Sequence, residues 1–255
     1  MSKFVDKLHK LTKPSAPAIG FHVAASKSKN PPMLFVAGLS GVDTAEVTNA
    51  VRSNADAGLI LNSSFKPGNL KKTTTAMGDI PIGVLIRGIT EKRVSKLINS
   101  GCDFVVFDMQ TSSAVLREEK TGKFLLVEPS LDQGLVNAIN NLDIDGVFIN
   151  KGEDPFITVK HLVVCHRFSK LLNKPLIVVL PSPITSVEIA NLWKASIAGI
   201  VAPTTQPVDT FAELKEAINS LAGQTKRRRD KANAVLPQYR EHISAEEEEE
   251  EEEEI

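Results

Sequence analysis

Four charged residues in the middle of the chain each come at the end of, or directly after, a short apolar run: Arg87, Asp108, Glu128 and Lys151. A lysine that is desolvated or lies near other cations loses its proton readily and can attack a carbonyl carbon to form a Schiff base. Carboxylates can move protons, and an arginine can hold a carboxylate or a phosphate. We therefore expect a lyase-type enzyme acting on a small oxo-acid or related carbonyl compound. Lys151, Asp108 and Glu128 would be catalytic, and Arg87 would bind the substrate.

The runs before these residues belong to a series of eight with near-regular spacing. They cover residues 33–38, 58–62, 81–87, 103–108, 124–128, 145–150, 176–180 and 199–202. Each run is almost continuously apolar, which is typical of a parallel strand buried on both faces. Alternation of eight strands with helices predicts an α/β fold, a single (β/α)8 TIM barrel. An open doubly wound sheet is the alternative.

Helical patterns fill most of the gaps between the runs. They cover residues 44–54, 91–99, 131–140, 155–172, 186–195 and 208–221. Asp43, Thr90, Ser130 and Asp154 are the expected N-caps, and Pro155 stands at a first helical position. Residues 69–77 are short and threonine-rich, and residues 111–120 suit one turn and a loop. We therefore expect the fourth helix of the barrel to be short or missing.

Three segments are predicted from these patterns: an N-terminal arm over 1–32, the barrel over 33–222 and a disordered tail over 223–255. Residues 3–11 form an amphipathic helix, with Phe4 and Leu8 on its apolar side, that we expect to pack on the barrel. A membrane-surface anchor is the alternative for this helix, although we expect no membrane partner. An extra strand over 18–24 would plug the barrel floor or form an edge hairpin.

The formal net charge of −1 hides a strong asymmetry along the chain. Residues 1–32 carry six Lys and one Asp, and residues 223–245 carry six basic and two acidic side chains. Residues 246–254 are nine consecutive glutamates. Basic arms of this kind can bind a nucleic acid or another anionic partner. The alternative is a solubilising tail without a specific partner.

Polar residues at the C-terminal ends of barrel strands are candidates for the site, because active sites of this fold lie there. Those expected to bind substrate with Arg87 are Ser40, Asn62, Ser182 and Thr204. Side chains alternate in and out along a strand, so Asn150 and Lys151 cannot both point inward. If Asn150 points inward, the lysine mechanism fails. Ion pairs that merely close the barrel top, Glu128 with Lys151 or Asp108 with Arg87, are the structural alternative.

No cluster of histidine, cysteine and carboxylate has the spacing of metal ligands, so we expect no metal. No cofactor is expected either, with FMN as the alternative. Cys102 and Cys165 lie within apolar segments, which indicates reduced, buried thiols. These features and the absence of a long apolar stretch predict a cytoplasmic protein that binds a small molecule, and they are compatible with a homo-oligomer.

The stretch from Met33 to Val47, followed by 57–62, resembles the first β/α/β unit of aldolase-type barrels. It is similar to the nitronate monooxygenases and to the inosine-monophosphate-dehydrogenase-like group, and this resemblance implies an FMN or a nucleotide phosphate as ligand. Those barrels hold the phosphate with glycine-rich turns after the seventh and eighth strands. Here Pro181 and Pro203 begin the matching turns, and proline has no N–H to donate.

Class I aldolases resemble the chain at a different place. Several of them carry a Schiff-base lysine on the sixth strand, where Lys151 stands in Asn-Lys-Gly-Glu-Asp. The resemblance implies the lyase chemistry described above. Two alternatives stay open: a barrel without catalysis that serves as a binding or scaffold protein through its charged arms, and an oxidoreductase barrel for FMN or a phosphate ligand.

Overall fold

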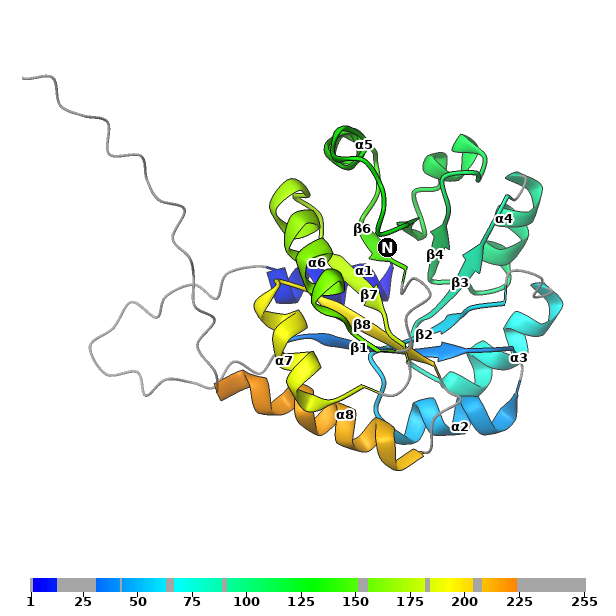
Figure 1. The fold of residues 1–255 in the computed structure, drawn as a ribbon. Helices are drawn as coiled ribbons and strands as arrows, with labels where there is room; N and C mark the ends of the chain where they lie inside the picture. The colour runs from blue at the N-terminus through cyan, green and yellow to red at the C-terminus, as the bar shows by residue number, and fades with distance from the viewer. Residues whose placement is uncertain are drawn as a thin grey trace, which may run out of the picture. The chain divides into compact units, whose positions relative to one another are not determined.

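The computed structural model describes residues 2–12, 31–41, 43–62, 67–88, 91–150, 156–181, 184–203 and 208–223. Eight parallel strands pair in sequence order and close into a barrel (Figure 1). The strands are β1 (Leu34–Leu39), β2 (Ala57–Ile60), β3 (Ile82–Ile86), β4 (Phe104–Phe107), β5 (Gly122–Val127), β6 (Gly146–Ile149), β7 (Leu176–Val179) and β8 (Gly199–Pro203). The predicted TIM barrel is confirmed, and the open sheet is excluded by the pairing of β1 with β8.

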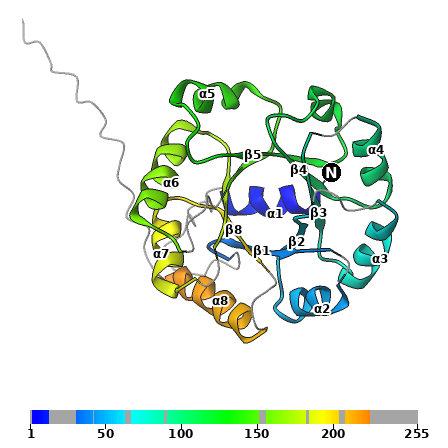
Figure 2. The ribbon, with the colours of Figure 1, turned by 45° about the vertical axis from the view of Figure 1, so that its right-hand side comes forward.

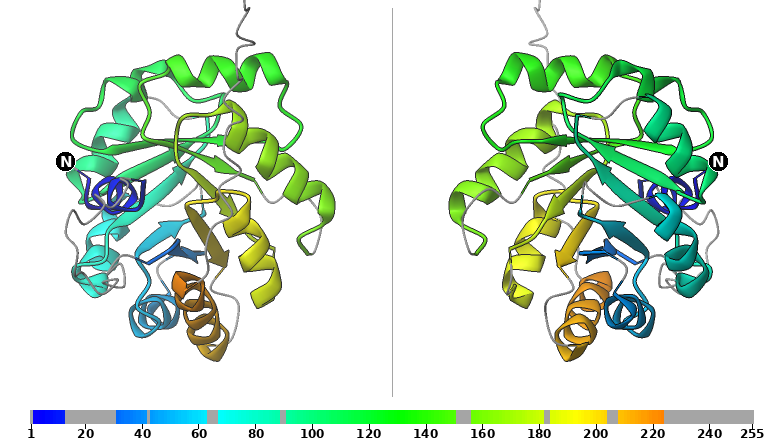
Figure 3. Two further views of the ribbon diagram at one scale, coloured as in Figure 1. Left: turned by 90° about the vertical axis from the view of Figure 1, so that its left-hand side faces the viewer. Right: turned by 90° about the vertical axis from the view of Figure 1, so that its right-hand side faces the viewer.

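Helices cover the outside of the ring of strands, as Figure 3 shows from two sides, except for the first helix, which lies across one end of the ring (Figure 2). They are α1 (Lys3–Thr12), α2 (Thr44–Arg52), α3 (Pro67–Met77), α4 (Glu91–Asn99), α5 (Gln133–Ala138), α6 (Val159–Leu171), α7 (Ser186–Lys194) and α8 (Val208–Ser220), with the short 3₁₀ turns η1 (Ser113–Arg117), η2 (Ile139–Asn141) and η3 (Leu221–Gly223). None of the helices in these ranges is long and apolar enough to cross a membrane. The chain divides into two units, Met1–Thr225 and Lys226–Ile255, and the second lies outside the described residues.

Most of the predicted helices are present, and the differences lie at their starts. Asp43 accepts a hydrogen bond from the amide of Ala45 and caps α2 as expected. The cap of α5 is Asp132 instead of Ser130, because the Asp132 carboxylate accepts from the amide of the second helical residue. Asp154 and Pro155 are the expected start of α6, but that helix begins at Val159.

The capping box of Thr158 explains the late start of α6. The Thr158 hydroxyl accepts from the backbone of His161, and the His161 ring accepts from the Thr158 backbone. This arrangement satisfies two of the amides that a helix start leaves open. The helix expected between β4 and β5 is reduced to the turn η1, as predicted. The threonine-rich segment, in contrast, forms the full helix α3. Thr90 and residues 18–24 lie outside the described residues.

Apolar side chains pack in two layers, one between strands and helices and one inside the barrel. The inner layer contains a ladder of aromatic rings from neighbouring strands. Phe104 and Phe124 have ring centroids 5.6 Å apart, and Phe124 and Phe148 are 5.4 Å apart. Edge-on contacts of this kind fill a barrel densely and add to the hydrophobic free energy of burial.

Glycines on neighbouring strands make room for these rings. A Cβ atom on Gly83 would lie 2.2 Å from the ring of Phe104. A Cβ atom on Gly122 would lie 2.9 Å from both Ser2 Oγ and Val5 Cγ2, which belong to the N-terminal segment. The strand wall therefore fits both the phenylalanines and the segment that covers the barrel floor.

Helix α1 closes the N-terminal end of the barrel, and Figure 2 shows it in the middle of the ring of strands. Phe4 is fully buried, and its ring stacks on Phe104 with 4.4 Å between centroids. Val5 and Leu8 are buried in the same inner cluster, and Leu11 packs against it. The expectation that this helix packs on the barrel is confirmed. The helix covers the floor of the barrel, which is one of the two positions expected for residues 18–24.

Polar contacts fix α1 at its start and at its middle. Asp103, which directly precedes β4, accepts hydrogen bonds from the backbone amides of Lys3 and Phe4 and from the Ser2 hydroxyl. A carboxylate at this position satisfies open amides and favours the positive end of the helix dipole. Further along, Lys7 Nζ donates to the carbonyl oxygen of Asp56 at 2.6 Å. Burial lowers the pKa of Lys7, and the nearby Asp56 carboxylate opposes this effect.

Replacement of Phe4 tests whether α1 is part of the core. We expect Phe4→Ala to lower the free energy of unfolding by about 3–5 kcal/mol, because it leaves a cavity next to Phe104 and Phe124. Chemical denaturation of the full chain measures the change. Lys72→Ala, at an exposed position of α3, is the control and should alter stability by less than about 0.5 kcal/mol. A small effect of Phe4→Ala would mean that α1 merely rests on a core that is already complete.

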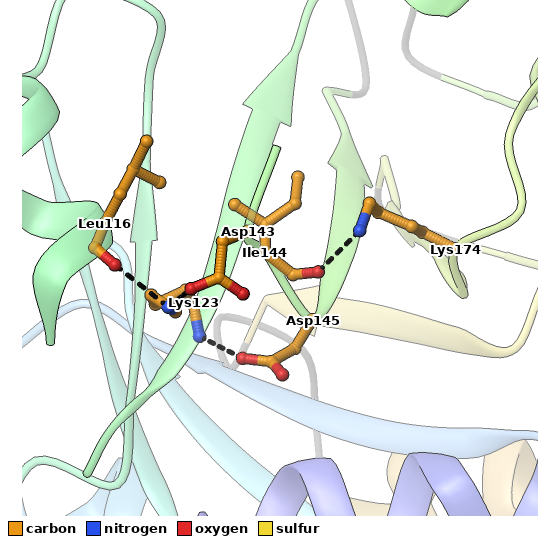
Figure 4. Close-up of polar contacts among 6 residues, drawn as sticks. All are labelled: Leu116, Lys123, Asp143, Ile144, Asp145 and Lys174. Carbon is orange, nitrogen blue, oxygen red and sulfur yellow. Dashed lines mark hydrogen bonds and ion pairs between the residues drawn. The ribbon is translucent and has the colours of Figure 1, made fainter. Parts of the chain in front are cut away.

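Charged groups cover the outer face of β5 and β6, where only the short turn η1 follows β4 in place of a full helix (Figure 4). Lys123 lies on β5, is only 6% exposed, and donates to the carbonyl oxygen of Leu116 in η1 at 3.0 Å. Its ammonium also contacts Asp143 Oδ2 at 2.5 Å. Asp145 accepts from the Lys123 amide at 2.7 Å, and Lys174 donates to the carbonyl of Ile144. The lysine thus joins η1 to the start of β6.

The Lys123–Asp143 contact predicts a pH dependence of stability. The hydrogen bond from Lys123 lowers the pKa of Asp143 from its ordinary value of 3.8. A carboxylate with a lowered pKa in the folded state stabilises the fold above that ordinary value, and the contribution is lost as the pH falls below it. We expect Asp143→Asn to reduce the rise of unfolding free energy between about pH 2 and pH 5, with little change in the slope above pH 5. Denaturation at a series of pH values measures it, and an unchanged acid limb would contradict the assignment.

Candidate functional site

The C-terminal tips of four consecutive strands carry polar side chains that follow the inward alternation of the barrel. Leu85, Val106, Leu126 and Phe148 belong to the inner cluster. Side chains two positions further along a strand point to the same side. The residues two positions on, at the tips of β3, β4, β5 and β6, are Arg87, Asp108, Glu128 and Asn150. These four define the mouth group.

Glu128 and Asn150 are joined across the tips of β5 and β6. Asn150 Nδ2 donates to Glu128 Oε1 at 2.9 Å. Asn150 therefore points toward the neighbouring strand at the mouth. Along a regular strand, the side chain after an inward one points away from the barrel interior. Lys151 itself lies outside the described residues, as does any ion pair between it and Glu128. Because Asn150 takes the inward position, the condition stated above for a Schiff base at Lys151 is not met, and that mechanism is disfavoured.

Asp108 organises the loops at the mouth. Its Oδ1 atom accepts from the Thr111 hydroxyl at 2.8 Å, from the Gln110 amide at 3.2 Å and, more weakly, from the Gly88 amide at 3.5 Å. These donors come from the turn after β4 and from the segment after β3. One carboxylate oxygen thus ties two neighbouring strand tips together.

Arg87 is exposed at the end of β3, directly before Gly88. Both Arg87 and Asp108 are described, and no ion pair joins them, so the interpretation of these two as a pair that closes the barrel top is wrong. Within the described part of the chain the guanidinium makes no hydrogen bond. Its five donors are therefore open to an anionic group, which an arginine binds in a bidentate manner.

Ser40 is already engaged by a residue that sequence reasoning missed. The amide and hydroxyl of Ser40 donate to the two carboxylate oxygens of Glu46 at 2.8 and 2.6 Å. Glu46 is the third residue of α2 after the cap Asp43, a position where carboxylates are common in helix starts. That signal was present in the sequence. The hydroxyl of Ser40 consequently supports the β1 tip and is less suited to hold a substrate.

The remaining predicted binding residues do not join the mouth group in the described part of the chain. Asn62 is exposed and follows Leu61, which packs against the inner cluster, so alternation places Asn62 on the opposite side of the chain. Ser182 and Thr204 lie outside the described residues. Pro181 and Pro203 are described, and neither can donate a backbone N–H to an anion.

Metal and thiol chemistry find little support in the described ranges. No group of three or more histidine, cysteine or carboxylate side chains there could hold a metal ion. Cys102 and Cys165 are free and buried, as expected. Burial raises the pKa of each thiol to about 12, so both are protonated and poorly nucleophilic at neutral pH.

Comparison with known proteins supports the architecture. No protein-family model matches the chain, and no curated protein matches its sequence. Solved structures of the tryptophan synthase α-subunit from Pyrococcus furiosus are similar in fold. One has a TM-score of 0.57 at 14% identity, covering 76% of this chain and 98% of that one. A structure of a point mutant of the same subunit has a TM-score of 0.59 at 13% identity with the same coverage.

These similarities confirm the (β/α)8 barrel fold. At 13–14% identity they show the fold alone. Function must be argued from the side chains at the mouth, because one barrel fold supports many chemistries.

Two substitutions of Asp108 separate its structural role from a chemical one. We expect Asp108→Ala to lower the free energy of unfolding by about 1–3 kcal/mol, because three donors lose their acceptor. Asp108→Asn keeps a carbonyl oxygen in the same place and should stay within about 1 kcal/mol of the wild type. Thermal and chemical denaturation measure both. Equal losses in the two variants would show that the negative charge, and not the hydrogen-bond geometry, holds the two loops.

Proposed function

We propose that the protein is an aldolase-type barrel enzyme, a lyase that acts on a small oxo-acid or related carbonyl compound at the barrel mouth. The observation that carries the proposal is the hydrogen bond of Asn150 to Glu128, which holds a carboxylate at the C-terminal tips of β5 and β6. Arg87 and Asp108 stand at the tips of the two preceding strands, β3 and β4. Active sites of this fold lie at that end.

Each member of the mouth group has a role that fits its contacts. Arg87 binds the substrate carboxylate through its open guanidinium. Glu128 moves the proton, because Asn150 occupies one of its oxygens and no described group is bonded to the other. Asp108 holds the loops that carry these groups, since its Oδ1 atom is fully used by three donors.

The proposed chemical step needs no external oxidant or reductant. The Glu128 carboxylate accepts the proton of a hydroxyl group β to the substrate carbonyl. The oxygen then forms a new double bond to the β-carbon, and the bond between the α- and β-carbons breaks. The electron pair of that bond stays on the α-carbon as an enolate, which is then protonated. A carbonyl product and an oxo-acid leave. In the Schiff-base form of the same reaction, Lys151 would replace the carbonyl oxygen by an imine nitrogen, with loss of water. That form is the less favoured one, because Asn150 takes the inward position at the tip of β6.

Proton exchange in D₂O tests the proposal without knowledge of the natural substrate. Small oxo-acids such as pyruvate are incubated with the full chain, and ¹H NMR follows loss of the protons next to the carbonyl. We expect exchange faster than in buffer, a fall of about 10²–10⁴-fold in kcat with Glu128→Gln, and a raised KM with Arg87→Gln. Glu119→Gln, an exposed carboxylate in the loop after η1, is the matched control and should behave as wild type.

Two results would decide against parts of the proposal. If no oxo-acid exchanges and none binds, an enzyme of this class is excluded, and binding through the charged arms becomes the better account. If exchange occurs but borohydride traps no adduct on Lys151, the Schiff-base form is excluded and the carboxylate form remains.

A further inference from the structure

We propose that Arg167 of α6 is a positioning residue for Glu128. It acts by holding the loop that connects β5 to α5, so that Glu128 keeps its contact with Asn150. The inference rests on the proposed function for its catalytic consequence. The claim that Arg167 holds the loop rests only on contacts between described residues.

Arg167 makes an unusual pair of contacts for an arginine. Its Nη2 atom donates to the carbonyl oxygens of Pro129 and Leu131, both at 2.9 Å. Its guanidinium carbon lies 5.1 Å from the centroid of the Phe168 ring. No ion pair links Arg167 to a carboxylate among the described residues. The cation is therefore committed to two backbone acceptors that flank one turn.

The inner nitrogen of Arg167 shows how closely the side chain is held. Its Nε atom is buried and has no hydrogen-bond partner among the described residues. A buried donor without an acceptor is unfavourable, so the surrounding contacts must compensate for it. A side chain that served only to solubilise α6 would turn this group toward water. The two hydrogen bonds that Nη2 donates to the loop offset the cost of the unpaired Nε.

Both acceptors belong to the turn that begins at Glu128. The amide of Leu131 donates to the Glu128 carbonyl at 3.1 Å, which closes the turn. Arg167 binds the second and fourth residues of this turn, Pro129 and Leu131. Pinning both carbonyls leaves the backbone of Glu128 little freedom to rotate. The direction of the Glu128 side chain toward Asn150 is thereby set from outside the barrel.

Substitution of Arg167 tests the clamp with two readouts that do not depend on activity. Arg167→Met keeps a long apolar side chain on Phe168 but removes both donors. We expect hydrogen exchange of the peptide covering residues 128–132 to rise about tenfold or more, and the ¹⁵N-edited NMR signal of the Asn150 side-chain amide to shift toward that of a solvated amide. Arg167→Lys can still donate to a carbonyl and should restore part of each effect.

Kinetics then test the consequence for Glu128. In the oxo-acid exchange assay, Arg167→Met should lower kcat by about 10- to 100-fold while KM stays near the wild-type value, because misplacement affects the proton transfer and leaves Arg87 in place. Lys170→Met removes an exposed cation of the same helix and is the matched control. It should leave hydrogen exchange, the Asn150 signal and kcat unchanged.

The outcomes separate this inference from the proposed function. Unchanged hydrogen exchange and an unchanged Asn150 signal in Arg167→Met overturn the clamp, whatever the activity. A freed loop with wild-type kcat overturns the positioning role while the proposed function survives. If the wild type shows no oxo-acid chemistry at all, the proposed function fails, and the Asn150 signal alone decides whether Arg167 orients Glu128.

Discussion

The closed ring of eight strands imposes one constraint from which the rest of the structure follows: every second side chain must point into the barrel. Lower in the ring the inward positions hold apolar groups, and the space is so limited that a Cβ on Gly83 would overlap the ring of Phe104. At the strand tips the same alternation turns Arg87, Asp108, Glu128 and Asn150 toward one opening. The core and the mouth are therefore successive levels of a single pattern.

The two ends of the barrel use charged residues in different ways. At the floor, carboxylates that precede strands make their hydrogen bonds to other parts of the fold. Asp56 accepts from the Phe35 amide and from Lys215, and Asp103 caps α1. At the mouth, Arg87 has no partner in the described part of the chain, and Glu128 has one donor. Charges at the floor raise stability because their partners lie within the fold, whereas Arg87 at the mouth is free to meet a ligand because no described residue binds its guanidinium.

The strands could be predicted from the sequence because a buried parallel strand has a simple signature, and all eight runs became strands within a few residues of the expected ends. Helix starts were less predictable. Asp154 followed by Pro155 matched the usual pattern, yet the Thr158–His161 capping box offered two hydrogen bonds further along. Arg167 had no local signal at all, because its acceptors lie 38 and 36 residues away. The mouth group could be named from strand ends, but which members touch required coordinates.

The contact between Asn150 and Glu128 also bears on which residues at the mouth could react and which hold the loops in place. A carboxylate that is to move a proton must keep one oxygen free and hold a fixed direction at the same time. Asn150 meets the first condition by binding only Oε1, and Arg167 meets the second by fixing the turn behind the residue. Asp108, with three donors on one oxygen, meets the requirement for direction but uses its hydrogen bonds on the loops. Both described carboxylates at these tips keep one oxygen without a described donor, and Glu128 is the one that is less committed to the surrounding backbone, with one donor where Asp108 has three.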